Sequence, residues 1–144
     1  MDETTTKKLD SILSGINDIR EMEDYFQNPK VSDNYDSFLD YFKSLDKVRS
    51  LPDSDLIKLS GIEKSYYYQI MKGSKTPSRD KVLRLCIGAG LSYRETIRAL
   101  EVSGNAILYS KNRRDIIITV AINQKQSVID TNILLDKYSE EPLK

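Results

Sequence analysis

The sequence of 144 residues predicts an all-α protein. Apolar side chains recur at steps of three and four residues along most of the chain, which is the spacing that lines one face of a helix. Residues able to cap a helix precede several of these stretches. Only residues 115–122 carry a run of the β-branched side chains that favour a strand. Because no other segment offers a partner strand, we expect this run to be a buried helix.

The first 50 residues are expected to form a helical hairpin. A first helix over residues 6–28 would end at Asn28-Pro29, because the residue before a proline is pushed out of the α region. Ser32 or Asp33 could cap the second helix. The apolar face of that helix would consist of Tyr35, Phe38, Leu39, Phe42, Leu45 and Val48.

Residues 51–103 are expected to form a second unit of short helices. Pro52 opens a helix over 52–60, Gly61 breaks it, and a second helix runs from residue 64 to 72. Ser78 follows a loop and can cap a third helix. Ser92 and Glu95 have the spacing of a capping box, so a fourth helix should reach about residue 102. The third helix should turn five apolar side chains inward: Val82, Leu83, Leu85, Cys86 and Ile87.

Residues 104–144 are expected to form a C-terminal helical extension packed on that unit. Asn112 could cap the helix over 115–122, and Ser127 with Asp130 could open the last helix. A polar tail is predicted from Ser139 onwards. The last helix carries Val128, Ile129, Asn132, Ile133, Leu135 and Asp136 at helical spacing.

Composition argues against several classes of protein. No segment has the roughly 18 consecutive apolar residues of a membrane span, the N-terminus is acidic where a signal peptide would be basic, and the single Cys86 has no thiol to pair with. We therefore expect a cytoplasmic protein without contact to a membrane. The chain has no histidine and no spacing typical of a metal or phosphate site. We expect no catalysis, no metal and no cofactor.

The net charge is zero, but the charges are unevenly distributed. Residues 1–50 hold 7 basic and 11 acidic side chains, whereas residues 51–84 hold 7 basic and 4 acidic side chains. The excess of positive charge therefore falls on the short helices of the second unit, where a nucleic acid would be attracted most strongly.

The segment from Leu56 to Gly73 has the order of parts of a helix-turn-helix. Gly61 and Ile62 supply the turn and its apolar plug, and Gly73, Pro77 and Ser78 follow at the spacing of a loop and a third helix. In these residues the chain resembles the phage-repressor-like (Xre-type) helix-turn-helix proteins over residues 51–103. The resemblance implies a lambda-repressor-like core and sequence-specific DNA binding in the major groove.

A second resemblance extends over nearly the whole chain. It is carried by the runs Tyr68-Gln69-Ile70, Pro77-Ser78-Arg79-Asp80-Lys81, Leu108-Tyr109 and Arg113-Arg114-Asp115. In these runs the chain resembles a group of uncharacterised helix-turn-helix proteins of Gram-positive bacteria, and this similarity implies no particular activity.

The phage-repressor resemblance also implies which residues would contact DNA. The residues that would read bases are Lys64, Ser65 and Gln69, with Tyr66 nearby; Lys72, Lys75 and Arg79 would hold phosphates. Lysine and glutamine suit guanine and adenine edges, respectively. An ordinary solvated surface is the alternative for Lys64 and Gln69. Tyr67 and Ile70, which face Leu59 and Ile62 across the turn, are expected to be core residues.

Asp53 and Asp55 depart from the phage-repressor pattern. They stand at the start of the first helix of the motif, where carboxylates favour the helix dipole but repel a phosphate. Two hypotheses therefore remain. One is a DNA-binding transcriptional regulator that binds double-stranded DNA, with a homodimer as one arrangement. The other is a non-catalytic adaptor that keeps the fold and binds a protein partner through its N-terminal or C-terminal helices.

Overall fold

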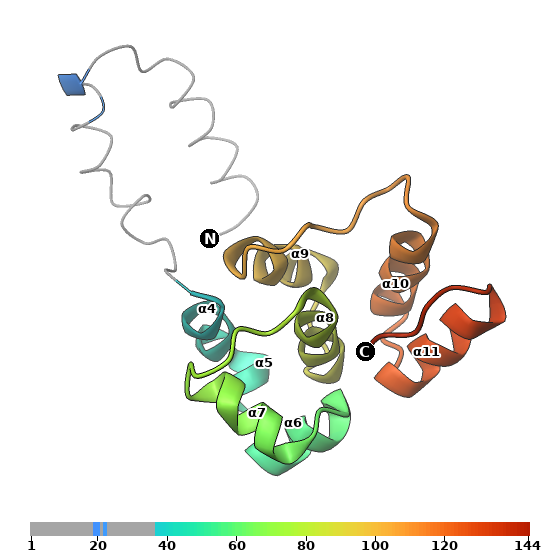
Figure 1. The fold of residues 1–144 in the computed structure, drawn as a ribbon, viewed down its shortest axis with the longest axis horizontal. Coiled ribbons are helices and arrows are strands. Elements are labelled where there is room, and N and C mark those ends of the chain that lie inside the picture. Colours follow the sequence, from blue (N-terminus) through green and yellow to red (C-terminus); the bar gives the residue numbers. More distant parts are fainter. Residues whose placement is uncertain (1–18, 21, 23–36) are drawn as a thin grey trace. The chain divides into compact units, whose positions relative to one another are not determined.

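The computed structural model describes residues 19, 20, 22 and 37–144, and Ser37–Lys144 form one compact unit. This unit contains eight α-helices and no strand, which confirms the predicted all-α class for the described residues (Figure 1). Most of the predicted first helix, and both Ser32 and Asp33, lie outside the described residues. The helices are α4 (Phe38–Ser44), α5 (Asp46–Arg49), α6 (Asp53–Ser60), α7 (Lys64–Met71), α8 (Arg79–Gly88), α9 (Tyr93–Val102), α10 (Arg113–Asn123) and α11 (Val128–Lys137).

The second helix predicted for residues 1–50 is interrupted in the structure. The Ser37 hydroxyl caps α4, and Leu45 leaves the helix with an extended backbone before α5 begins. α4 packs on α9, and the Tyr41 hydroxyl donates a hydrogen bond to the Glu95 carbonyl oxygen at 3.4 Å. Because these contacts join it to α9, the segment from Ser37 to residue 50 belongs to the same compact unit as the helices that follow.

The four helices predicted for residues 51–103 are confirmed as α6 to α9. Gly61 ends α6 with a left-handed backbone at φ 66°, as the turn requires. Ser78 caps α8, and Ser92 and Glu95 form both bonds of the capping box at the start of α9. α8 lies among the other helices and contacts α6, α9 and α11 (Figure 1). All five of its predicted inward side chains are buried.

α6 and α8 approach each other closely at Gly88. A Cβ atom added there would lie 2.9 Å from the Ser60 amide nitrogen and 3.0 Å from the Leu59 carbonyl carbon. Both atoms belong to the backbone, so neither can rotate away. The absence of a side chain at Gly88 therefore sets the distance between these two helices.

Gly88→Ala is expected to destabilise the protein by about 1–3 kcal/mol, because the added methyl group must push the end of α6 away from α8. The roughly 1 kcal/mol that alanine gains over glycine applies to a helix interior, whereas Gly88 is the last residue of α8, so this gain offsets little of the cost. Urea denaturation followed by circular dichroism measures the difference, with Glu101→Ala on the exposed surface of α9 as the control. A midpoint equal to or above that of the parent would contradict the close packing.

The C-terminal extension differs from its prediction in two places. α10 is helical as predicted, but it buries one side only, since Ile116 and Val120 are exposed. The residues after Ser139 are not merely a polar tail, because Leu143 is only 2% exposed. Its burial depends on side chains from other helices, described below. None of the described helices is long and apolar enough to cross a membrane.

Candidate nucleic-acid interface

α7 has one buried face and one exposed face. Tyr67 is 1% exposed and Ile70 is fully buried, so both are core residues as predicted. Lys64, Ser65 and Gln69 are exposed. Tyr66 lies between the two faces and is half-buried. The structure therefore brings the predicted base-reading residues together on one helix.

Leu59 does not belong to the core. It lies in the last turn of α6 and is 46% exposed, whereas Leu56 and Ser60 of the same helix are buried. The buried side of α6 therefore passes through positions 56 and 60, one helical turn apart. Ile62, beyond the turn, is buried and fills the corner as predicted.

A hydrogen bond between Tyr67 and Asp53 joins α7 to the start of α6. The Tyr67 hydroxyl donates to the Asp53 carboxylate at 2.7 Å. Burial raises the pKa of Tyr67 well above its ordinary value, and the Asp53 hydrogen bond and negative charge raise it further. The tyrosine therefore stays a neutral donor. Asp53, which the sequence associated only with the helix dipole and phosphate repulsion, is also a structural acceptor.

Two of the predicted phosphate-binding residues, Lys72 and Lys75, are exposed at the end of α7 and in the loop after it. A third cation, Lys43 of α4, donates to the Met71 carbonyl oxygen at 3.0 Å and so lies at the same end of α7. At the start of the helix, the Ser65 hydroxyl donates to the Glu63 carboxylate. This bond uses the only donor of the serine side chain.

Arg79, the third predicted phosphate contact, is not grouped with Lys72 and Lys75. Its guanidinium donates to both carboxylate oxygens of Asp115, at 3.0 and 2.9 Å, and to the carbonyl oxygens of Ala106 and Ile107. Asp115 is buried and also accepts the Tyr109 amide hydrogen at 2.9 Å. Arg79 therefore holds the segment between α9 and α10 in place, and its guanidinium is not available to a ligand in this structure.

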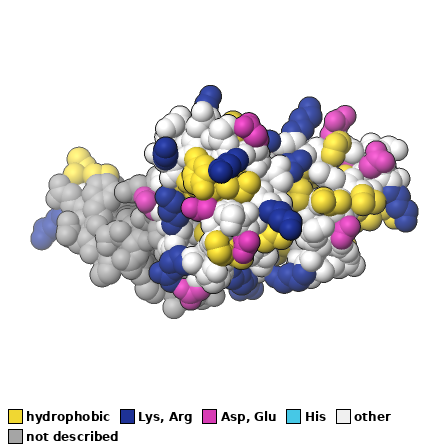
Figure 2. Space-filling model, turned by 90° about the horizontal axis from the view of Figure 1, so that it is seen from below, with side chains coloured by type: hydrophobic (Ala, Val, Ile, Leu, Met, Phe, Trp, Pro, Cys, Tyr) yellow, Lys and Arg dark blue, Asp and Glu magenta, His cyan; other side chains and the backbone are white. Residues whose placement is uncertain are grey.

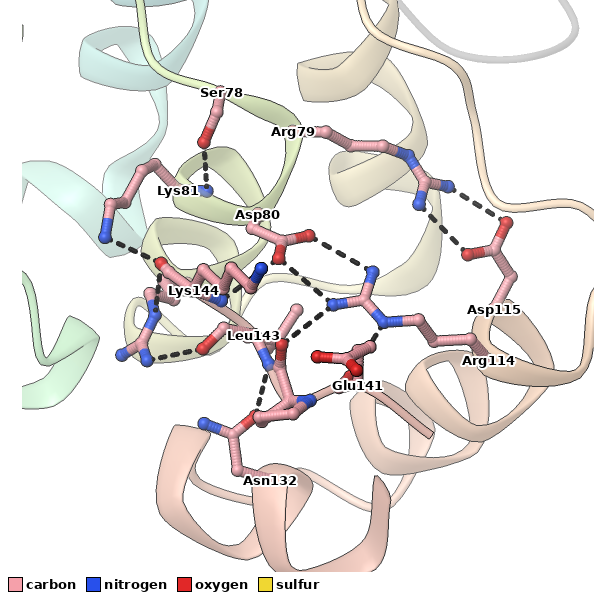
Figure 3. A network of polar contacts seen from close by, with 12 residues as sticks. Ser78, Arg79, Asp80, Lys81, Arg114, Asp115, Asn132, Glu141, Leu143 and Lys144 are labelled. Atoms are coloured by element: carbon pink, nitrogen blue, oxygen red, sulfur yellow. Dashed lines mark hydrogen bonds and ion pairs between the residues drawn. The ribbon is translucent and has the colours of Figure 1, made fainter. Parts of the chain in front are cut away.

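A second ion pair lies beside the first. Arg114 of α10 donates to both carboxylate oxygens of Asp80, at 3.2 and 3.1 Å. Two Arg-Asp dipeptides, 79–80 at the start of α8 and 114–115 at the start of α10, thus pair reciprocally (Figure 3). Burial by itself raises the pKa of Asp80, but the hydrogen bonds from Arg114 and the Lys144 amide outweigh burial and lower it overall.

Residues 141–144, called here the C-terminal strap, are held by side chains of three helices (Figure 3). Arg114 of α10 donates to the carbonyl oxygens of Glu141 and Pro142. Asn132 of α11 accepts the Leu143 amide hydrogen at 2.7 Å. From α8, Lys81 and Arg84 donate to carbonyl oxygens of the strap, and Asp80 accepts the Lys144 amide hydrogen.

The positive charge counted on residues 51–84 is therefore only partly available on the outer surface. Arg79, Lys81 and Arg84 donate to other parts of the protein, whereas Lys64, Lys72 and Lys75 are exposed. Viewed from the side on which α6 and α7 lie, basic side chains are scattered with acidic ones between them rather than gathered in one patch (Figure 2). Neighbouring opposite charges weaken the field that a nucleic acid would meet.

The described residues contain no group of three His, Cys, Asp or Glu side chains placed to hold a metal ion. Cys86 is fully buried in α8, and burial raises the pKa of its thiol to about 12. It is therefore a small core residue and not a nucleophile at neutral pH. A shallow pocket of about 490 Å³ lies beside Arg79, Tyr109, Asn112 and Asp115, where the arginine and the aspartate already pair with each other.

Comparisons of the chain with protein-family models, with curated proteins and with solved structures found no match.

Proposed function

We propose that the protein is a sequence-specific DNA-binding transcriptional regulator whose α6, turn and α7 act as a lambda-repressor-like helix-turn-helix. The observation that carries the proposal is the division of α7 into two faces. Tyr67 and Ile70 fix the helix to the core, while Lys64 and Gln69 are exposed, directly after the left-handed turn at Gly61. A helix held in this way can enter the major groove.

In this proposal Gln69 reads adenine through its amide and Lys64 reads guanine through its ammonium group. Tyr66 contacts the edge of the groove. Ser65 contributes a base contact only if it exchanges its Glu63 acceptor for one on DNA. Lys72 and Lys75 contact phosphates, while Arg79 stays with Asp115 and contacts none.

The electrostatic contribution to binding should be modest. Asp53, Asp55 and Glu63 lie near the exposed lysines in the sequence of the motif, and their carboxylates oppose the approach of phosphates. Base contacts must therefore supply an unusually large share of the affinity. We expect weak binding to random duplexes and a shallow decline of affinity with added salt.

The test is selection of a binding site from a random duplex library, followed by titration of variants. Gln69→Ala and Lys64→Ala should each cost about 1–3 kcal/mol on the selected site and change binding to random duplexes little. Gln124→Ala and Lys111→Ala, which remove exposed residues of the same types outside the motif, are the matched controls. Equal losses of affinity for selected and random duplexes would mean that the two residues contact phosphates and do not read bases.

One observation favours the adaptor as a second candidate. Ile129 and Ile133 of α11 are 72% and 62% exposed and lie one helical turn apart. Neighbouring exposed apolar side chains are typical of protein contacts, either with a partner or with a second copy of the chain. Failure to select any DNA site, together with an association that Ile133→Ser abolishes, would favour this candidate over DNA binding.

A further inference from the structure

Lys81 and Arg84 are bound to one shared acceptor. The main-chain oxygen of Lys144, in the C-terminal strap, accepts from Lys81 Nζ at 2.6 Å and from Arg84 Nε at 3.1 Å. Two cationic donors that meet at a single oxygen form an arrangement suited to an anion. Consistent with this crowding, burial and then the Arg84 charge lower the pKa of Lys81.

The same two cations also contact the proposed helix-turn-helix. Lys81 Nζ lies 5.7 Å from the centre of the Tyr66 ring on α7. Arg84 donates to the Ser60 carbonyl oxygen at the end of α6, at 3.1 Å. Both therefore stand between the strap and the two helices that would face DNA. A phosphate near the turn would lie within reach of both side chains if the strap moved away.

The strap is held in a way that permits such movement. It has no secondary structure of its own, and Glu141, Pro142 and Lys144 are exposed. Only Leu143 is buried, and its amide is held by the half-buried Asn132. Segments with one apolar anchor and hydrogen bonds at the surface open more readily than packed helices.

We propose that Lys81 and Arg84 form a phosphate-binding pair that the C-terminal strap occupies, and that release of the strap lets the pair contact the DNA backbone. The proposal rests on the proposed DNA binding. While the strap is bound, the main-chain oxygen of Lys144 takes the place of a phosphate oxygen. Strap release therefore adds two cationic contacts and raises affinity for any duplex, without changing which sequence is preferred.

Leu143→Ser in the full chain tests the proposal, because it removes the only buried side chain of the strap. The control is Ile133→Ser, which makes the same kind of change on the exposed side of α11. The rate of hydrogen exchange at the backbone amides of residues 143 and 144 reports strap release independently of DNA. We expect exchange at least tenfold faster in Leu143→Ser and unchanged in Ile133→Ser.

Titration of a random duplex at several salt concentrations is the second measurement. Two added phosphate contacts, from Lys81 and Arg84, should steepen the slope of log affinity against log salt by about 1.8. Affinity at low salt should rise at least tenfold in Leu143→Ser. Adding Lys81→Gln and Arg84→Gln to that variant should remove the gain, whereas Lys111→Gln should not.

Circular dichroism and thermal melting show whether Leu143→Ser still folds. Asn132→Ala, which removes only the acceptor of the Leu143 amide, serves as the milder second variant. Faster amide exchange without a gain in affinity or slope would overturn the strap proposal and leave the proposed DNA binding intact. If neither the parent nor a folded strap variant binds any duplex, both proposals are wrong.

Discussion

Tyr67→Ala is expected to lower the free energy of unfolding by about 3–5 kcal/mol, as truncation of large aromatic core residues does. The ring is 1% exposed and lies against Tyr68, with 5.3 Å between the ring centres. The substitution also removes the hydroxyl that ties α7 to Asp53. Since the chain has no tryptophan, urea unfolding followed by circular dichroism is the suitable measurement.

Tyr67→Phe separates the contribution of the ring from that of the hydroxyl. It keeps the packing and removes only the hydrogen bond, so it should cost about 1 kcal/mol. Asp53 is exposed and can recover a bond to water. A Tyr67→Ala variant whose unfolding midpoint changes no more than that of Lys58→Ala, on the exposed side of α6, would contradict the described register of α7.

Asp115→Ala is expected to cost about 3 kcal/mol, because it leaves the Arg79 guanidinium without its carboxylate in a largely buried position. The side chains of Arg79 and Asp115 are 24% and 7% exposed, so the pair is shielded from water on most sides. The variant also removes the acceptor of the Tyr109 amide. Thermal and urea unfolding of the full chain measure the loss.

The double variant Arg79→Leu with Asp115→Leu provides the control. Replacing both charges with apolar side chains leaves no unpaired ion, so its loss should be much smaller than the sum of the two single losses. Additive losses would mean that the two residues stabilise the protein through separate contacts.

The helices could be predicted because their signals are local. Asn112 and Ser127 cap the amide three residues further on, a spacing visible in the sequence itself. The capping box of Ser92 and Glu95 follows the same rule. The break at Leu45 has no such signal, because the apolar spacing continues across it. α4 packs on α9, a contact that cannot be seen from the sequence around Leu45.

The candidate site was only partly predictable, because some of its contacts join residues that are far apart in the sequence. The exposed face of α7 follows from the periodicity of eight residues. The partners of Asp53 and Arg79 lie 14 and 36 residues away, and no periodic pattern relates them. A count of charges along the chain assumes that every lysine and arginine faces the solvent. Lys81 and Arg84 break that assumption, because the strap lies beside them only in the folded chain.

The reciprocal pairing of the two Arg-Asp dipeptides has a consequence for the evolution of the chain. A change in one dipeptide alone would leave a charge on the other helix unpaired in a place with little access to water. Positions 79, 80, 114 and 115 should therefore be inherited as a unit. Where they do change, we expect both members of a pair to change together, as in an exchange of arginine and aspartate between helices. Such coupled variation would identify diverged relatives even after their surface residues have been replaced.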